Sequence, residues 1–425
     1  MKVTCNIDVK HLTRVEGHGN ISIRIRNGVV EEAVWEVVET PRFFEALLVG
    51  KSWENAPWIC GRICGICSIG HTLASIRAVE RAFGIEPDWQ TSSLRLLLKH
   101  METLQSHVLH LYFLAAPDLL GTGSVLPLIE SHPDIVQRAA RLKLLANDAC
   151  DIIGGRRLHP TRTVVGGFTM LPQKSELDLI RRRLVMSLVD LTHTADLFAT
   201  LALPGFRRET EFVSLAAGSN GYPFIGGDLV SSDGVRRSEH EYRSMTNEYC
   251  VARSTSKWSR LSRQSFAVGA LARVNNNFAA LSDGAGEVAR AFGLAPVNHN
   301  PFMNNIAQLV ECVHVVEDSI RLIDSLTAAS WTQPRQPVVP RAGVGVGAVE
   351  VPRGILYHSY EFDPDGRILR ADCVIPTSQN HANIQHDIEE LARQYADEGK
   401  SDREIELAAS MLVRAYDPCI SCSVH

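Results

Sequence analysis

Residues 60–71 read Cys-Gly-Arg-Ile-Cys-Gly-Ile-Cys-Ser-Ile-Gly-His, and residues 417–425 read Asp-Pro-Cys-Ile-Ser-Cys-Ser-Val-His. Each segment holds one Cys-x-x-Cys pair: Cys64/Cys67 and Cys419/Cys422. Two thiolates separated by two residues can bind one metal ion, and a glycine lets the backbone turn tightly between them. Soft sulfur ligands suit zinc, an iron–sulfur cluster or nickel, and spacing alone does not choose among them. The sequence therefore predicts a four-sulfur metal site that joins both ends of a large fold.

Two other metal sites fit part of this pattern. A structural zinc ion with four cysteine ligands matches the spacing, but small zinc modules take their ligands from one stretch of chain. Here the two pairs begin 355 positions apart, at residues 64 and 419. Cys60 and the first pair also match the Cys-x3-Cys-x2-Cys pattern of radical S-adenosylmethionine enzymes. Those enzymes consist of repeated strand–helix units, which the helical pattern after residue 72 does not show.

The composition is that of an ordinary globular protein. Of 425 residues, 45% are hydrophobic and 21% charged, which argues against disorder. The net charge of −5 gives no basic footprint for nucleic acid, and no apolar run approaches the roughly 20 residues of a membrane span. Ten cysteines with only two close pairs are not a disulfide framework. With no signal-peptide pattern or twin arginine at residues 1–10, we expect a cytoplasmic protein.

Apolar periodicity predicts the fold class. Residues 4–38 alternate between apolar and polar side chains on both sides of Asn27-Gly28, which predicts a β-hairpin. A second β-rich segment spans 347–374 and contains the turn sequence Asp-Pro-Asp-Gly at 363–366. Between and after these segments, apolar residues recur every three or four positions, which predicts helices in the ranges 136–153, 175–201, 303–329 and 385–414.

One of these helical stripes is especially regular. It consists of Leu94, Leu97, Leu98, Met101, Leu104, His107 and Val108. We predict a mainly α fold with small β-sheets near both ends, an α+β architecture. Residues 1–425 are expected to form one domain: a β-rich segment with the first Cys pair at 1–71, a mostly helical core at 72–340, and a β segment, helix and terminal Cys pair at 341–425.

Taken together, the motifs resemble those of nickel–iron hydrogenase large subunits. The two cysteine segments resemble the two signature ends of that family, and further similar motifs follow in family order: Arg14-Val-Glu16-Gly17-His18, Arg42-Phe-Phe-Glu45, Ser106-His107-x2-His110, His159-Pro160, Pro352-Arg353-Gly354 and Pro376-Thr377. The resemblance covers nearly the whole chain. It implies the large-subunit fold of the family and reversible heterolytic cleavage of dihydrogen into protons and electrons.

The resemblance also implies a nickel–iron centre held by the four cysteines. Cys64 and Cys419 would bind nickel alone, and Cys67 and Cys422 would bridge nickel to iron. The iron of the family carries carbon monoxide and cyanide. Cys419 is the expected first proton acceptor, because a terminal thiolate beside nickel is basic.

Other site residues are implied by the same motifs. Arg353 would lie over the open coordination position near a cyanide, because a guanidinium offers several donors in one plane. Asp417 would hold that guanidinium, and Thr377, after Pro376, would bind another diatomic ligand. Read alone, Arg353 is an ordinary arginine paired with an acid, and Asp417 is a turn residue.

A further group of residues would surround the centre. Glu45 and His425 would bind magnesium or a similar hard ion, and His71 and His107 would lie near the metals. Glu16 would relay protons from Cys419 to solvent, which requires burial to raise its pKa. Read alone, Glu45 is an exposed helix acid and His107 is a core residue. Even with the resemblance, Glu16 has an alternative role as a structural acid paired with Arg14 or Arg62.

The resemblance implies partners as well. No further set of cysteines binds a cluster, so an iron–sulfur small subunit is expected, with further flavin or iron–sulfur subunits beyond it. Ser106 stands where many respiratory members have an acid, which favours the cytoplasmic, cofactor-coupled members. Two alternatives remain: a hydrogen-sensing regulatory member, and a complex-I-like quinone-site subunit. The second class has lost the nickel cysteines, which this chain retains.

Overall fold

The computed structural model describes residues 3–218 and 221–425. Its strands are β1 (Cys5–Val9), β2 (Gly19–Arg26), β3 (Val29–Val37), β4 (Thr163–Val164), β5 (Gly167–Phe168), β6 (Glu211–Leu215), β7 (Leu229–Ser231), β8 (Arg236–Arg237), β9 (Phe266–Ala267), β10 (Gly343–Val351), β11 (Gly354–Phe362) and β12 (Ile368–Val374).

Helices make up much of the rest of the fold. They are α1 (Phe44–Leu48), α2 (Ala56–Cys60), α3 (Ser68–Phe83), α4 (Trp89–Leu109), α5 (Ala116–Leu119), α6 (Leu128–Ser131), α7 (Pro133–Gly154), α8 (Lys174–Ala199), α9 (Tyr242–Thr246), α10 (Ala270–Asn277), α11 (Asp283–Ala291), α12 (Asn304–Ala328), α13 (Pro376–Asp397) and α14 (Asp402–Ala415). The π-helical turn η1 (His110–Ala115) and the 3-10 turns η2 (Glu239–Glu241), η3 (Phe278–Ala280), η4 (Pro301–Met303) and η5 (Ser421–Val424) complete the set.

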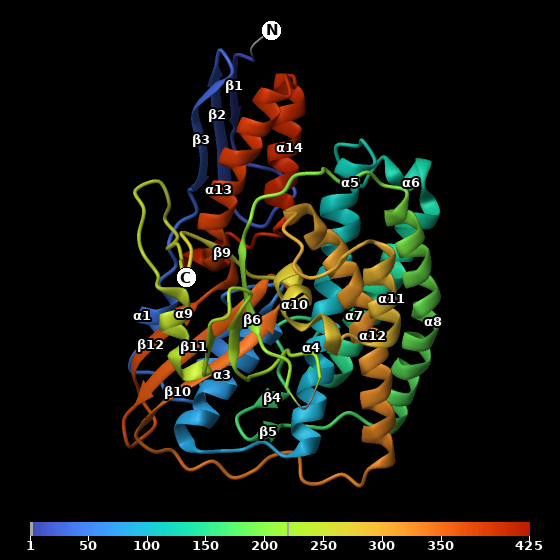
Figure 1. Cartoon of the computed structure of the whole chain (residues 1–425). Helices are drawn as coiled ribbons and strands as arrows, with labels where there is room; N and C mark the ends of the chain where they lie inside the picture. The colour runs from blue at the N-terminus through green and yellow to red at the C-terminus, as the bar shows by residue number, and fades with distance from the viewer. Residues whose placement is uncertain (1–2, 219–220) are drawn as a thin grey trace.

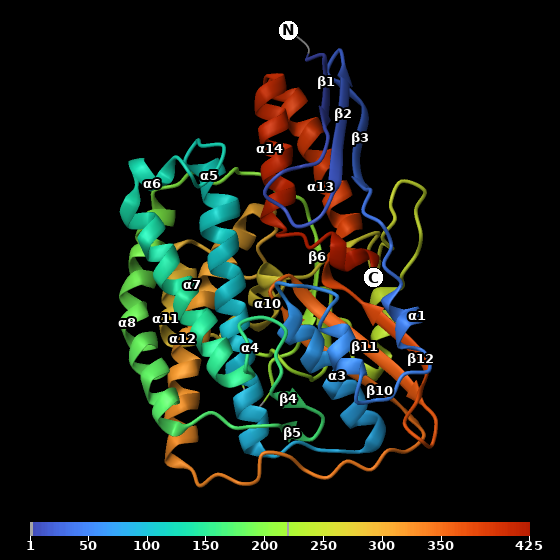
Figure 2. The same cartoon turned by 180° about the vertical axis from the view of Figure 1, so that it is seen from behind.

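The N-terminal sheet confirms the predicted hairpin. Strands β1, β2 and β3 are antiparallel neighbours, and β2 and β3 are joined by Asn27 and Gly28, whose φ angles are +50° and +78°. Two positive φ angles match the right-handed twist of a two-residue hairpin, which explains the Asn-Gly sequence. Helices α13 and α14 stand beside this sheet (Figures 1 and 2), and Gln385 of α13 bonds the backbone of both Ala33 and Trp35.

Helix α3 lies almost directly on the second sheet, β10–β11–β12. Three alternate residues of β10 that face it are Gly343, Gly345 and Gly347. A Cβ at Gly345 would lie 1.9 Å from the carbonyl oxygen of Ala78, and one at Gly347 would lie 2.1 Å from that of Ala74. Since α3 begins immediately after Cys67, this contact fixes the first cysteine pair against the sheet.

A helical bundle forms the other side of the molecule (Figures 1 and 2), with α12 packed against both α4 and α8, and α4 against α7. The predicted stripe on α4 is confirmed, because its members are at most 1% exposed. The predicted helical range 385–414 was wrong in one respect: α13 ends at Asp397 and α14 begins at Asp402. Gly399 lies between them with φ +73°, a conformation that ends a helix.

The mainly α fold with small sheets near both ends is confirmed, and two sheets were not predicted: the two-stranded β4–β5 and the four-stranded β8–β7–β6–β9. Strands β8–β7–β6–β9 lie in the middle of the chain and are only two to five residues long, too short for a clear alternation. They cover the face of β10 and β11 that α3 leaves free, where Leu215, Leu229 and Tyr357 belong to one buried cluster. Among the described residues, no helix is apolar over a length that could cross a membrane.

Candidate metal centre

The four paired cysteines converge in the core. Their sulfur atoms all lie within 4.8 Å of one another, and Sγ of Cys64 is 3.6 Å from Sγ of Cys419. Cys67 precedes the first residue of α3, and Cys422 lies in η5. Each of the four residues is at most 4% exposed. Cys419 and Cys422 are in S–S contact, so metal binding requires this pair to be reduced.

The C-terminal segment is held by the predicted Arg14–His18 motif. Glu16 pairs with Cys419 as a parallel β-bridge, and the Ile420 amide donates to the carbonyl of Glu16 at 2.9 Å. A Cβ at Gly17 would lie 2.8 Å from the amide nitrogen of Ser421, so only glycine permits this approach. These contacts explain why the motif lies so far in sequence from the cysteine it supports.

The carboxylate of Glu16 has a partner that the sequence did not predict. It accepts hydrogen bonds from the amide and hydroxyl of Ser421, the amide at 3.0 Å. The alternative of a structural ion pair with Arg14 or Arg62 is wrong: Arg14 pairs with Asp118, and no ion pair joins Glu16 to Arg62 among the described residues. Glu16 is half-buried. Its backbone pairs with Cys419, and its carboxylate contacts Ser421, two residues after Cys419 in the sequence.

The sulfur of Cys64 lies in an electropositive environment. The amides of Ile66 and Cys67 point at it from 3.2 and 3.3 Å. The pKa of the Cys64 thiol is lowered by the hydrogen bond from the Cys67 thiol and, against the effect of burial, by the charge of Arg353. A lowered pKa favours the thiolate, the form that binds metals.

Arg353 lies at the tip of the two-residue hairpin that joins β10 to β11. Its Nη2 donates to Oδ1 of Asp417 at 2.7 Å, and Nη1 lies 3.5 Å from the hydroxyl oxygen of Ser106. Burial lowers the pKa of Arg353, but the negative charges of Asp417, Cys67 and Cys64 together outweigh burial and raise this pKa, so the guanidinium stays protonated. Its Nε–H has no partner among residues 3–218 and 221–425. Arg353 and Asp417 therefore form the predicted pair, and the Nε–H of Arg353 remains available for another acceptor.

Thr377 contacts the second cysteine pair through the backbone. Its hydroxyl oxygen accepts a hydrogen bond from the amide of Cys419 at 3.0 Å. Thr377 is placed there because α13 begins at Pro376, whose fixed φ suits the first position of a helix. The hydroxyl of Thr377 retains its own proton for a further bond.

The two predicted histidines are fully buried. Nε2 of His107 lies 2.7 Å from a carboxylate oxygen of Glu311, and Nδ1 of His71 lies 3.1 Å from Nε2 of His358. Burial lowers the pKa of both imidazoles, so they are neutral near pH 7. The second ring nitrogen of each has no partner in the part of the chain that the structure describes.

Glu45 is not the exposed acid that its local sequence suggests. Its side chain is 29% exposed; Oε1 lies 3.6 Å from Nε2 of His425 and accepts from the amide of Cys373 at 2.8 Å. Burial raises the pKa of Glu45, but the hydrogen bond and charge of His425 outweigh it and lower that pKa to about 2. Two motifs at opposite ends of the chain thus meet as one carboxylate–imidazole pair.

Sequence reasoning missed a set of buried polar residues behind Arg353. Helix α12 presents Asn304, Gln308 and Glu311 on one face, at spacings of four and three. Gln308 donates to Oδ2 of Asp417 at 3.2 Å, and Glu311 forms an ion pair with Arg273 of α10. The signal was present as polar residues repeating along an otherwise apolar helix.

The comparisons with known proteins agree over the whole chain. The family model described as nickel-dependent hydrogenase matches residues 42–134 and 237–425, and a HoxL-like model matches residues 6–40. The alpha chain of sulfhydrogenase 1 of Pyrococcus furiosus is 36% identical over 99% of this chain and 97% of its own length. One chain of the F420-non-reducing hydrogenase of Methanothermobacter thermautotrophicus is 30% identical over 99% of this chain and 94% of its own.

A solved structure gives the same result. The crystal structure of an NAD+-reducing NiFe-hydrogenase in the H2-reduced state superposes with a TM-score of 0.89. It is 26% identical in sequence, and the match covers 99% of this chain and 100% of that one.

Proposed function

Because this chain belongs to the nickel-dependent hydrogenase family, we propose that it is a catalytic subunit that reversibly splits dihydrogen into protons and electrons. The observation that carries the proposal is the cluster of four buried sulfurs beside the Arg353–Asp417 pair. A quinone-site subunit of the same fold would lack these cysteines. A hydrogen-sensing member would keep these cysteines but turn over slowly. The specific activity therefore separates a catalytic subunit from a hydrogen sensor.

The donor set fits a nickel–iron centre. Cys64 and Cys419 would bind nickel, and Cys67 and Cys422 would bind both metals, because the four sulfurs lie close enough to surround two adjacent ions. When bound, such a centre with carbon monoxide and cyanide on iron supplies the chemistry that splits dihydrogen heterolytically. The free Nε–H of Arg353 and the hydroxyl of Thr377 would each donate a hydrogen bond to an anionic diatomic ligand.

Protons would leave through residues of the chain itself. The Cys419 thiolate would act as the first base, and Glu16 would carry the proton onward. Support comes from the bridge that places Glu16 beside Cys419 and from the half-buried position of its carboxylate, between the core and the surface.

Glu45 and His425 would bind magnesium or a similar hard ion. A carboxylate is a ligand that magnesium prefers, and the lowered pKa of Glu45 keeps it ionised. This ion would lock the segment that carries Cys419 and Cys422 to the helix that carries Glu45.

Electrons would leave to an iron–sulfur subunit that docks over Gly65. Among the described residues, the four-cysteine group is the one set of three or more clustered His, Cys, Asp or Glu side chains, so a further iron–sulfur carrier has to come from another chain. Gly65 lies exposed between Cys64 and Cys67, and no atom lies within 4 Å of a Cβ placed there. Further flavin or iron–sulfur subunits would pass the electrons on. The cytoplasm suits this assembly, because its reducing conditions keep the four thiols free.

The metal content of the purified complex tests the proposal. We expect nickel and iron in equal amounts, with infrared bands of metal-bound carbon monoxide and cyanide. Cys67→Ser should lose both metals, because Cys67 would hold both of them. Cys150→Ser is the matched control: Cys150 is equally buried but lies in α7, outside the sulfur cluster. Zinc alone, without infrared bands, would contradict the assignment.

A further inference from the structure

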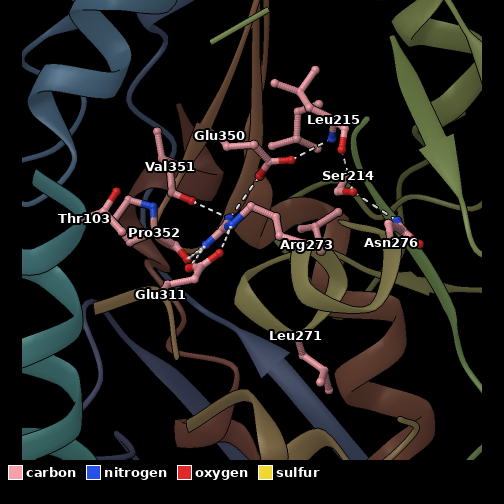
Figure 3. A network of polar contacts seen from close by, with 12 residues as sticks. Thr103, Ser214, Leu215, Leu271, Arg273, Asn276, Glu311, Glu350, Val351 and Pro352 are labelled. Carbon is pink, nitrogen blue, oxygen red and sulfur yellow. Dashed lines mark hydrogen bonds and ion pairs between the residues drawn. The ribbon is translucent and has the colours of Figure 1, made fainter. Parts of the chain in front are cut away.

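Arg273 of α10 is a fully buried arginine whose side chain donates five hydrogen bonds to four residues (Figure 3). It donates to both oxygens of Glu311, at 2.6 and 2.7 Å, and to Oε2 of Glu350 at 2.9 Å. It also donates to the backbone carbonyls of Val351 at 2.9 Å and Pro352 at 3.1 Å. Those two carbonyls belong to the residues immediately before Arg353.

The Arg353 hairpin is enclosed from a second direction. A Cβ at Gly354 would lie 2.4 Å from Val268, and the carbonyl of Arg353 packs against Gly269. Gly269 is the residue before α10, and its carbonyl accepts the amide of Arg273 at 3.0 Å. The start of α10 therefore supports the hairpin tip, while the side chain of Arg273 holds the carbonyls behind it.

We propose that Arg273 is a positioning residue that fixes Arg353 beside the four sulfurs by holding the two preceding carbonyls. This inference rests on the role given to Arg353 in the proposed function. The guanidinium is suited to the task because its rigid fork serves two carboxylates and two carbonyls at once. A lysine ammonium has three donors on a flexible stem and cannot reproduce all five bonds.

Glu311 anchors this arrangement rather than transferring protons. Besides Arg273, its carboxylate accepts from Tyr222 at 2.7 Å and lies 2.7 Å from Nε2 of His107. With both oxygens engaged by a permanent cation, the carboxylate stays ionised. The same carboxylate thus joins Arg273 to the helix that carries His107 and Ser106, and the hydroxyl of Ser106 lies 3.5 Å from Nη1 of Arg353.

A double-mutant cycle of Arg273→Lys with Arg353→Lys tests the proposal in the intact complex. Turnover is expressed per bound nickel. Arg273→Lys should lower kcat by about tenfold or more, because a misplacement of about 1 Å can cost about a hundredfold, with little change in KM for dihydrogen. In the Arg353→Lys background, Arg273→Lys should have no further effect, because its contribution passes through Arg353. If the kcat losses of the two single variants multiply in the double variant, the proposal is overturned.

Arg95→Lys is the matched control. Arg95 makes a buried bidentate pair with Glu80 and bonds the carbonyl of Val164, but it does not touch the hairpin. It should lower the thermal midpoint as Arg273→Lys does, with kcat per nickel unchanged. If Arg353→Lys alone keeps wild-type turnover, the proposed role of Arg353 fails. If only the Arg273 effect is absent, this inference fails by itself.

Two further measurements extend the test: the first does not depend on turnover, and the second uses a different variant. In a crystal structure of Arg273→Lys, the hairpin tip should move and the Arg353–Asp417 contact should lengthen from 2.7 Å. An unmoved hairpin would contradict the proposal. If Arg273→Lys does not fold, Glu350→Gln is used as the test variant. This change weakens one hydrogen-bond partner of Arg273 while keeping the shape of the Glu350 side chain. We expect Glu350→Gln to lower kcat less than Arg273→Lys does, and to have no effect in the Arg353→Lys background. An undiminished loss in that background would contradict the proposal.

Discussion

Arg353 and Asp417 are 64 residues apart in sequence and meet as a buried ion pair, with Nη2 and Oδ1 2.7 Å apart. Their side chains are 3% and 1% exposed. Arg353 is carried by the β10–β11 hairpin, and Asp417 directly precedes the segment with the second cysteine pair. The pair therefore holds that segment against the sheet β10–β11–β12.

Removing one partner of this pair should be strongly destabilising. Asp417→Ala leaves a buried guanidinium without its counter-charge, which typically costs about 3–5 kcal/mol. We expect a large fall in the thermal midpoint, measured by calorimetry. Glu390→Ala, which removes the partner of Arg393 in an exposed pair, should leave the midpoint nearly unchanged. Equal shifts for the two variants would refute the buried pair as a stabilising contact.

Replacing Glu16 with glutamine separates proton transfer from structure. Glu16→Gln keeps an oxygen that can accept the Ser421 amide, so nickel, iron and the infrared bands should remain. Hydrogen turnover and hydrogen–deuterium exchange with water should fall, because an amide cannot carry a proton through ionisation.

Ser421→Ala provides the control for this change. It removes a hydroxyl that bonds Glu16 but keeps the carboxylate, so exchange should continue. A fully metallated Glu16→Gln enzyme that exchanges at the wild-type rate would exclude Glu16 as the relay.

The contact between α3 and β10 predicts an unusual sensitivity to a single methyl group. Gly345→Ala would place Cβ 1.9 Å from a backbone oxygen of α3, so the helix has to move. Overpacking of this kind costs about 1–3 kcal/mol, and the movement should also lower nickel content. Gly205→Ala is the control, since a Cβ there meets no atom within 4 Å. Calorimetry and metal analysis of both variants check the prediction.

Stability should fall in mild acid because of His314. Burial, aided by the charge of His100, lowers the pKa of this imidazole from 6.5 to about 4. The unfolded chain therefore binds a proton between these values that the folded chain does not. The free energy of unfolding is therefore unaffected by this group above pH 6.5. It falls as the pH drops from 6.5 to 4, by about 3 kcal/mol in total.

Unfolding midpoints between pH 4 and 7 measure this effect. His314→Gln should flatten the pH dependence, whereas His132→Gln, at an exposed position, should leave it unchanged. An equally steep pH dependence in His314→Gln would show that other groups cause it.

The cysteine pairs and the Asn27-Gly28 hairpin could be predicted from sequence because each is a local pattern with one physical meaning. The helix stripe on α4 was predictable for the same reason, since burial repeats with the helical period. The partners of Glu16 and Arg14 could not be predicted this way. Local sequence does not say which of several acids and hydroxyls a charged side chain meets across 100 or more residues.

Arg273 illustrates the same limit more sharply. In sequence it is one arginine among many, in a short helix that ends with three asparagines. Its importance comes from two carboxylates and two carbonyls that reach it from β10, α12 and the hairpin. Such a convergence is a property of the folded chain, and no spacing in the sequence encodes it.

The four sulfurs that meet in the core are not made at the same time. Cys64 emerges from the ribosome early, and Cys419 follows 355 residues later. At roughly 5–20 residues per second, the interval is on the order of 20 to 70 seconds. A metal ion that arrives during translation therefore finds only two of its four thiolates. The complete centre can form only after synthesis has passed Cys422, when residues 417–425 can close over Cys64 and Cys67.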